Sequence, residues 1–435
     1  MRPATIHPTT SRRKTSGLIA TLAGAHFSHH VLTAMLVPLI PFIRDEFGLS
    51  YAQSGIVNSA FTIAYGIAQL PAGWLSDRIG PRYLLLVGIT GVAIAGAFVG
   101  LSPAFGLLLV GLLAMGIAGG SYHPAASAVI AKVVAPGRRG RAMGLHIVGG
   151  SSSHFLAPLI AAGLVALVGW RGSFLALSAP VAVLGVVLFG MIHRRLEQSE
   201  RDGANDLERQ TGTGAANASP QPSANGTQTA GEAGRGVMRR PHHVLGLTIF
   251  LVLTGFIGAT TATLIPFVPL YLVDVRGVDE RLAAGFISII YGAGFFAAPL
   301  GGWLSDVLGR TRVMTIIGLL TAPVIALVVV APFPIALGFL LLGMGVLLFT
   351  KMPTAEAHIA SEVSERYRTT VLGIYFFSGM EGSAILTPML GAAIDRWGFR
   401  TGFLSLAAVM AAIAIVCGAG LVAIKRTGAK SEYHT

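Results

Sequence analysis

Long apolar stretches alternate with short polar segments along the whole chain. Twelve of these stretches are long enough to cross a bilayer as helices, which takes about 20 residues at a rise of about 1.5 Å each. They lie at residues 17–43, 52–75, 83–101, 104–132, 142–168, 173–192, 243–273, 281–304, 313–331, 335–360, 370–394 and 400–424. The pattern predicts an all-α membrane protein with twelve transmembrane helices arranged as two six-helix bundles.

The two sets of six stretches are copies of one another, displaced by 229 residues. The segment Gly-Trp-Leu-Ser-Asp at 73–77 returns at 302–306. Gly169, in a later loop, returns as Gly398 at the same offset. A constant offset over so much of the chain indicates a tandem duplication. Because each copy has an even number of spans, both copies have the same orientation, and the internal repeat is parallel.

Basic residues indicate which side of the membrane the loops face. With both termini placed in the cytoplasm, the cytoplasmic segments hold 24 of the 31 Lys and Arg residues, and the outer loops hold six. Cytoplasmic loops of membrane proteins carry an excess of Lys and Arg, so we expect both termini to be cytoplasmic. The net charge of +12 is spread over these short loops, which argues against a nucleic-acid-binding surface.

The polar break between the two sets differs in composition from the rest of the chain. Residues 193–242 are of low complexity and cannot bury enough apolar surface to fold. The predicted organisation is a cytoplasmic N-terminal tail (1–16), an N-terminal six-helix bundle (17–192), a flexible cytoplasmic linker (193–242), a C-terminal six-helix bundle (243–424) and a C-terminal tail (425–435).

Composition excludes several classes of function. Only 11% of the residues are charged, against about 25% in soluble globular domains. No lysine has the Gly-Lys-Ser/Thr setting of a phosphate-binding loop, so the chain encodes no nucleotide-driven pump. No catalytic constellation stands out either, and we expect neither an enzyme nor a cofactor.

Ionisable residues inside the spans are the first candidates for function, because Arg, Lys or Asp costs about 2.5–3.5 kcal/mol at the centre of a span. His26 and His30, with His29 between them, lie on one face of the first span. Imidazoles titrate near neutral pH, so this face is a candidate for carrying protons. Neutral histidines that hydrogen-bond a neighbouring helix are the alternative. A divalent-metal site is possible from the same geometry, but no Asp or Cys supports it, and we expect no bound metal.

Glu381 lies at the centre of the eleventh span and is the principal candidate for a proton site. A permanent hydrogen bond or ion pair to another helix is the alternative. Lys351, in the tenth span, could neutralise Glu381 or attract an anionic substrate. The other side chains predicted to line a substrate cavity are His123, His154, Asn58, Thr62, Tyr65, Gln69 and Tyr291.

The loop after the second span resembles the signature of the major facilitator superfamily of secondary transporters, and the copy at 302–312 resembles its weaker echo. The resemblance implies two six-helix bundles that rock about a substrate site near the membrane midplane. It also implies a charge network that locks a cytoplasmic gate. The residues that the resemblance assigns to this gating loop are Gly73, Asp77, Arg78, Gly80, Arg82, Arg139, Arg141, Asp306 and Arg310.

Finer motifs resemble the fosmidomycin-resistance branch of this superfamily, among them Ser-Tyr-His-Pro at 121–124. Drug antiporters of the superfamily carry Gly-Pro-x-x-Gly-Gly in the fifth span. Here Ala157, Ala161 and Ala162 stand in for the glycines. Small side chains are kept at these positions, so the resemblance favours export.

The sequence therefore predicts a secondary active transporter of the bacterial inner membrane that works by alternating access. It is expected to export a small organic compound, an anion or a drug, by proton coupling. Its expected partners are the small-molecule substrate, protons and the lipid bilayer, with no nucleic acid. The alternatives are a proton-coupled symporter that imports a small organic anion, a non-transporting membrane receptor, and a metal transporter.

Overall fold

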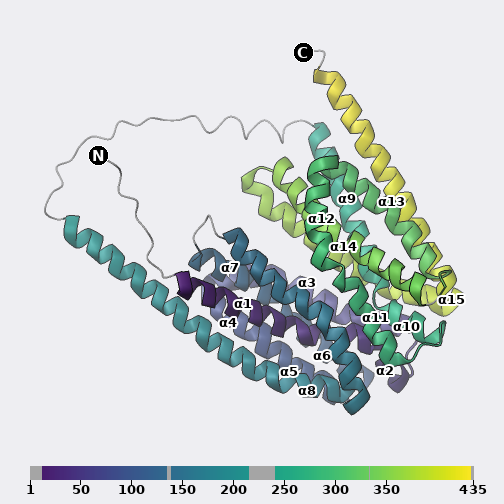
Figure 1. Cartoon of the computed structure of the whole chain (residues 1–435), viewed down its shortest axis with the longest axis horizontal. Coiled ribbons are helices and arrows are strands. Elements are labelled where there is room, and N and C mark those ends of the chain that lie inside the picture. Colours follow the sequence, from purple (N-terminus) through teal and green to yellow (C-terminus); the bar gives the residue numbers. More distant parts are fainter. Residues whose placement is uncertain (1–11, 135–138, 215–240, 333, 433–435) are drawn as a thin grey trace.

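The computed structural model describes residues 12–134, 139–214, 241–332 and 334–432, which are mostly helical (Figure 1). The helices of the first half are α1 (Arg12–Thr33), α2 (Leu36–Phe47), α3 (Tyr51–Ile79), α4 (Pro81–Leu86), the π-helical turn η1 (Val87–Gly91), α5 (Val92–Leu101), α6 (Phe105–Gly120), α7 (Tyr122–Val133) and α8 (Arg139–Gly214). Those of the second half are α9 (Pro241–Leu264), α10 (Phe267–Asp274), α11 (Glu280–Gly292), α12 (Gly294–Leu308), α13 (Arg310–Val328), α14 (Ile335–Glu362) and α15 (Glu365–Glu432).

Many of these helices have the length and composition of membrane spans. Nine stretches of the described residues meet both requirements. Two of them, Ala142–Arg194 and Thr370–Lys425, have 53 and 56 residues, about twice what a bilayer requires. Each contains a glycine with a non-helical backbone, Gly169 in α8 and Gly398 in α15, where two helices are joined at a kink. The all-helical membrane fold predicted from the sequence is therefore confirmed.

The backbone repeats the duplication seen in the sequence. Among the described residues, positive φ angles occur only at six glycines. They form three pairs, each separated by the offset of 229 residues: Gly48 and Gly277 (φ 60° and 64°), Gly80 and Gly309 (91° and 87°), and Gly169 and Gly398 (69° and 76°). Because other residues rarely adopt this conformation, both copies keep glycine where the chain turns.

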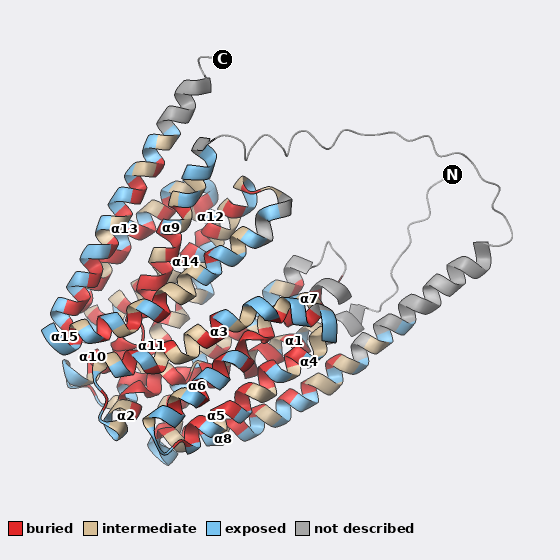
Figure 2. Ribbon diagram, turned by 180° about the vertical axis from the view of Figure 1, so that it is seen from behind, coloured by how far each residue is buried: buried red, intermediate tan, exposed pale blue. Residues whose placement is uncertain are grey.

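The outer surface of the helices carries large apolar side chains, as contact with lipid requires. Ile94, Leu167 and Phe339 have exposed fractions of 66%, 81% and 70%. Figure 2 shows exposed residues along the outward faces of the helices and buried residues between them. Apolar exposure on this scale would promote aggregation in water, whereas a bilayer covers it.

The two halves lie side by side and meet at one end of the molecule (Figure 1). The end where they meet carries α2 and α10, and we call it the α2–α10 end. Toward the opposite end, where α3 turns into α4 and α12 turns into α13, the halves diverge; we call this the glycine-loop end. Ile40 of α2 is buried in the apolar core of the second half, so the first half packs into that core at the α2–α10 end.

Two predicted segment boundaries fall inside helices. Helix α8 continues from the predicted boundary at 192 to Gly214, and α15 continues past 424 to Glu432. The first part of the predicted flexible linker is therefore helical. It is rich in Arg, Glu, Gln and Leu, which are good helix formers, and His193 pairs with Glu197 one turn later at 3.3 Å. Residues 215–240 lie outside the described part of the chain.

Candidate functional site

Six histidines gather inside the first half, and we call them the histidine cluster. They are His26, His29 and His30 on α1, His123 on α7, and His146 and His154 on α8. The ring centroid of His26 lies 4.8 Å from that of His30 and 5.1 Å from that of His123. That of His30 lies 4.4 Å from that of His154. The packing of α1, α7 and α8 thus brings together six histidines that lie in three different predicted spans.

Backbone carbonyl groups fix the tautomers of four of these rings. The contacts are Nδ1 of His26 to the oxygen of His146 (2.9 Å), Nδ1 of His29 to Gly88 (2.7 Å), Nδ1 of His146 to Leu22 (3.1 Å) and Nδ1 of His154 to Gly150 (2.9 Å). A carbonyl oxygen only accepts, so each Nδ1 carries a hydrogen and donates it. In the neutral ring, each Nε2 then keeps a lone pair.

Two of these lone pairs have different surroundings. Nε2 of His29 lies 3.3 Å from the hydroxyl of Tyr65, which donates to it. Nε2 of His26 is buried and has no hydrogen-bond partner among the described residues. Tyr65, predicted to line a cavity, is itself buried and packs against the cluster. Four rings of the cluster are thus held by hydrogen bonds at Nδ1, while Nε2 of His26 has no hydrogen-bond partner among the described residues.

The other polar residues of the predicted stripe on α3 have local or cross-half contacts. The hydroxyl of Thr62 donates to the carbonyl of Asn58 one turn earlier, at 3.0 Å. Gln69 reaches across to the second half, where its Nε2 lies 3.6 Å from the sulfur of Met380. Gln69 therefore takes part in the contact between α3 and α15.

Glu381 lies at this same contact between the halves. Its Oε1 atom is buried and has no hydrogen-bond partner within the described structure. It faces Gly66 of α3, where an added Cβ atom would collide with Oε1. The absence of a side chain at Gly66 is therefore what makes room for the carboxyl group between α3 and α15.

Lys351 is a second buried ionisable group in the second half. It is 8% exposed, and its Nζ atom lies 5.2 Å from the centre of the Tyr375 ring, a cation–π contact. Among the described residues no ion pair joins it to Glu381, one of the two roles considered for it from the sequence. Lys351 thus places an ammonium group inside the second half, with no carboxylate paired to it among the described residues.

Tyr291 of α11 contacts the histidine cluster from the second half. Its ring centroid lies 5.2 Å from that of His154. Close by, the hydroxyl of Ser288 donates to the carbonyl of Phe155 at 2.8 Å. The predicted cavity residues His154 and Tyr291 are therefore neighbours at the contact between α8 and α11.

The described residues of the predicted gating loop contact their own half. Arg78 is exposed and lies 4.2 Å from the ring centre of Trp74. Arg82 lies 3.0 Å from Nδ1 of His193. Gly80, with a positive φ, ends α3 at the turn, whereas Gly73 lies within α3. In the second copy Asp306 is exposed while Arg310 is half-buried. The side chains of Asp77, Arg139 and Arg141 lie outside the described part, and the charge network stays a prediction.

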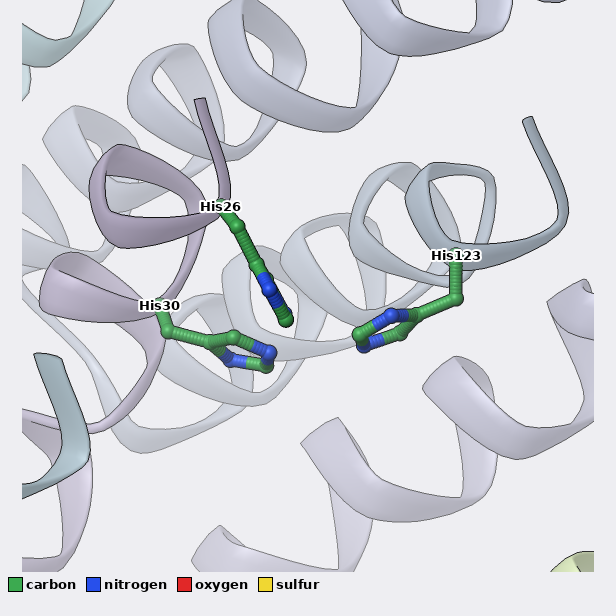
Figure 3. Close-up of side chains that lie close together, drawn as sticks. All are labelled: His26, His30 and His123. Carbon is green, nitrogen blue, oxygen red and sulfur yellow. The ribbon is translucent and has the colours of Figure 1, made fainter. Parts of the chain in front are cut away.

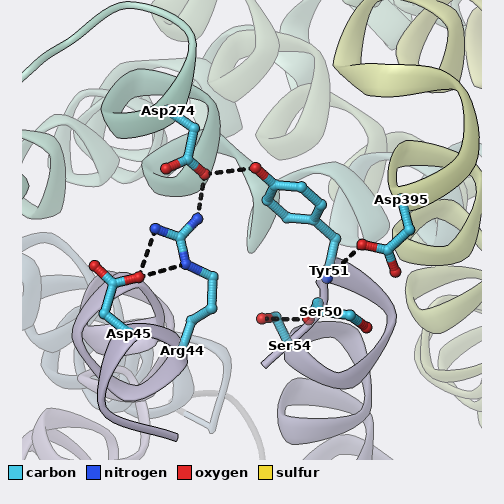
Figure 4. Close-up of polar contacts among 7 residues, drawn as sticks. All are labelled: Arg44, Asp45, Ser50, Tyr51, Ser54, Asp274 and Asp395. Carbon is cyan, nitrogen blue, oxygen red and sulfur yellow. Dashed lines mark hydrogen bonds and ion pairs between the residues drawn. The ribbon is translucent and has the colours of Figure 1, made fainter. Parts of the chain in front are cut away.

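A polar network joins the halves at the α2–α10 end, and the sequence did not reveal it (Figure 4). Arg44 pairs with Asp45 at 2.7 Å and with Asp274 of the second half. The hydroxyl of Tyr51 donates to Asp274 at 2.8 Å. Both oxygens of Asp395 accept backbone N–H groups of α3, from Tyr51 at 2.8 Å and Ala52 at 2.9 Å. The offset of 229 residues between Asp45 and Asp274 was the one signal available.

The sequence profile of the Major Facilitator Superfamily matches residues 22–385 of the chain. The chain belongs to the Major Facilitator Superfamily. This is a family of transporters rather than enzymes, as predicted from the gating loop and its copy. The multidrug resistance protein MdtG of Dickeya zeae (strain Ech586) is 27% identical over 405 residues, 89% of this chain and 88% of that protein.

Two further relatives match shorter parts of the chain, whereas a solved structure aligns with almost all of it. A probable L-galactonate transporter of Escherichia coli (strain K12) is 35% identical over 161 residues, only 36% of this chain and 35% of that transporter. The fosmidomycin resistance protein of the same strain is 26% identical over 186 residues, 43% of this chain and 45% of that protein. The crystal structure of a bacterial homologue of the human lysosomal transporter Spinster, inward-facing and occupied, aligns with a TM-score of 0.71 at 17% identity over 96% of this chain and 98% of that one.

Proposed function

We propose that this superfamily member exports a small organic anion across the bacterial inner membrane in exchange for protons. The proposed topology has twelve spans and cytoplasmic termini. It is supported by the kinks at Gly169 and Gly398, which divide the two double-length stretches, and by α3, whose 29 residues suffice to cross a bilayer. It is also supported by the placement of 24 of the 31 basic residues on one side.

In this topology the α2–α10 end faces outward and the glycine-loop end faces the cytoplasm. The halves meet at the outer end through Arg44 and Asp274 and diverge at the inner end. This arrangement is the one expected of the cytoplasm-facing state of an alternating-access cycle. The opposite state requires the network at the α2–α10 end to break.

The observation that carries the proposal of proton coupling is the buried Oε1 atom of Glu381, which has no hydrogen-bond partner among the described residues. A carboxylate buried without a hydrogen bond or counter-ion is costly, so the packing against Gly66 suits the protonated acid. When α3 and α15 separate, water reaches the carboxyl group and the proton can leave. Binding and release of one proton are then tied to the contact between the halves. His26 and His30 are the second place where protons could bind.

Lys351 supports an anionic cargo. A buried ammonium group that no carboxylate of the described residues neutralises attracts an anion that can reach it, because the interior screens charge poorly. The names of two relatives point the same way, since L-galactonate and sulfoacetate are both organic anions. The names of two others, multidrug resistance protein and fosmidomycin resistance protein, support export.

Proteoliposomes that contain the unaltered chain test the proposal. Labelled carboxylates, sulfonates and phosphonates are offered under a pH gradient of either sign. Export in exchange for protons predicts that an anion accumulates in the lumen when the lumen is the acidic side. Accumulation when the bath is the acidic side would identify a symporter instead, and accumulation under neither gradient would refute proton coupling.

Import of an organic anion together with protons is the second candidate. Lys351 fits it as well as it fits export, and so do the names of the L-galactonate and sulfoacetate transporters. The same gradient experiment separates the two, because only the sign of the effective gradient differs.

Replacing Lys351 by Gln is expected to raise the KM for the anion about tenfold. A hydrogen bond to a charged group contributes about 1.5–3 kcal/mol, and about 1.4 kcal/mol corresponds to one factor of ten. Initial rates of uptake over a range of anion concentrations measure the change. Lys425→Gln, which removes the same charge from an exposed position at the end of α15, is the matched control. An unchanged KM in Lys351→Gln would exclude Lys351 from the binding site.

A further inference from the structure

We propose that the histidine cluster binds one divalent late transition-metal ion, of the zinc and copper class, through His26, His30 and His123. The three rings point toward one another, two from α1 and one from α7 (Figure 3). Their ligand nitrogen atoms all lie within 4.8 Å of one another. The proposal of this metal site does not depend on proton coupling or on the direction of transport.

The spacing of the rings fits one shared ion. Their centroids lie 4.8 Å (His26 and His30), 5.1 Å (His26 and His123) and 5.3 Å (His30 and His123) apart. Three imidazoles around a tetrahedral ion, with metal–nitrogen bonds of about 2.0–2.1 Å, have centroids about 5 Å apart. The backbone therefore already holds the rings at the required separation, and rotations of the side chains suffice to aim the nitrogen atoms.

Hydrogen bonds orient the ligands in the way that metal sites require. Histidines that bind a metal through one nitrogen usually donate the other N–H to a carbonyl or a carboxylate. His26 does this toward the carbonyl of His146, which leaves its buried Nε2 free to bind. Nδ1 of His30 lies 3.4 Å from the hydroxyl oxygen of Thr33. That hydroxyl donates to backbone carbonyls of α1, so it accepts from His30.

The chemistry of the cluster favours a metal ion over other ligands. Nitrogen lone pairs that face one another repel and cannot hydrogen-bond to one another, whereas a single metal cation can bind all of them. A proton bridges two nitrogen atoms at most, and a metal ion binds three or four. His154, whose Nδ1 donates to the carbonyl of Gly150, is placed next to His30 as a fourth ligand. Neutral imidazoles select zinc, copper or nickel over magnesium and calcium, which prefer oxygen.

Metal and protons compete for the same lone pairs in this cluster. Metal affinity is therefore expected to fall as the pH is lowered, because protonated imidazoles cannot bind a metal. While a metal ion occupies the site, His26 and His30 cannot carry protons. Coupling would then depend on Glu381 alone.

Titration of the purified full chain with Co²⁺ tests the site without any transport measurement. The chain is prepared in detergent with an affinity tag that contains no histidine. One Co²⁺ per chain is expected, with the intense visible absorption of tetrahedral nitrogen coordination, and Zn²⁺ but not Mg²⁺ should displace it. His26→Gln, His30→Gln and His123→Gln are each expected to weaken binding about a hundredfold. His358→Gln, in the second half, is the matched control and should bind as the unaltered chain does.

Two further measurements separate loss of a ligand from loss of the fold. Thermal unfolding of each variant without metal shows whether it is folded. The spectrum of Cu²⁺ bound to the unaltered chain counts the coordinated imidazoles, and three or four are expected. Fewer than three coordinated imidazoles or a weak octahedral Co²⁺ spectrum would overturn the proposal. So would unchanged binding in a folded variant that combines His26→Gln, His30→Gln and His123→Gln.

Discussion

Glu381→Gln is expected to abolish accumulation of the cargo against its gradient. With a difference of about two pH units and one proton per anion, the unaltered chain could reach about a hundredfold accumulation, because each factor of ten is worth about 1.4 kcal/mol. The variant should reach equal concentrations on both sides. Its amide is always neutral, so it packs against Gly66 as the acid does but carries no proton. Exchange of labelled for unlabelled cargo should continue.

Two comparisons make this result interpretable. Glu362→Gln removes a carboxylate from the end of α14, where Glu362 pairs with His243, and it should accumulate cargo normally. Both variants are checked for thermal stability, because Gln is nearly isosteric with Glu and should leave the fold intact. Accumulation that persists in Glu381→Gln would move the proton site to His26 and His30.

Reversing the charge in Arg44→Asp is expected to open the α2–α10 end and to reduce transport about thirtyfold. The change breaks the pair with Asp274 and adds repulsion from Asp45. A shift of about 2 kcal/mol between the two states changes their ratio about thirtyfold. Spin labels placed on α2 and α10 should report a longer distance in the variant, and initial rates of transport give the functional loss.

The double variant Arg44→Asp with Asp274→Arg should recover both the distance and most of the rate, because the pair is restored with the charges exchanged. Arg400→Asp makes the same charge change at an exposed position on the same end. It is the control and should alter neither the distance between the spin labels nor the rate of transport. Failure of the double variant to recover, with both single variants folded, would show that the pair does not hold this end closed.

The sequence was sufficient for the helical membrane fold and the superfamily because both depend on local patterns. Span length follows from the thickness of the bilayer, and the turns need glycine at fixed positions. Gly80 and Gly309 mark the same turn in both copies, and such repeated residues made the duplication visible in the sequence alone. Helix ends were less predictable. The composition after residue 192 suggested a flexible linker, but α8 continues to Gly214 because this segment is rich in good helix formers.

The arrangement of the site residues was predictable only where they lie on the same helix. The spacing of His26 and His30 put them on one face of α1, and the structure agrees. Their approach to His123 depends on how α1 packs against α7, which periodicity does not specify. His146 was missed because one polar residue near the end of a predicted span looks interfacial. For the network around Arg44, the return of Asp45 as Asp274 was a weak signal, because charges are expected at every span end.

The start of α3 is completed by the opposite half of the molecule. Backbone N–H groups in the first turn of a helix have no partner within the helix, and Asp395 supplies one for Tyr51 and for Ala52. Whenever the halves part at this end, these two amides lose their acceptor and become open to exchange with solvent deuterium. Their exchange rate, followed by mass spectrometry on the unlabelled and unmutated protein, therefore measures how often the α2–α10 end opens.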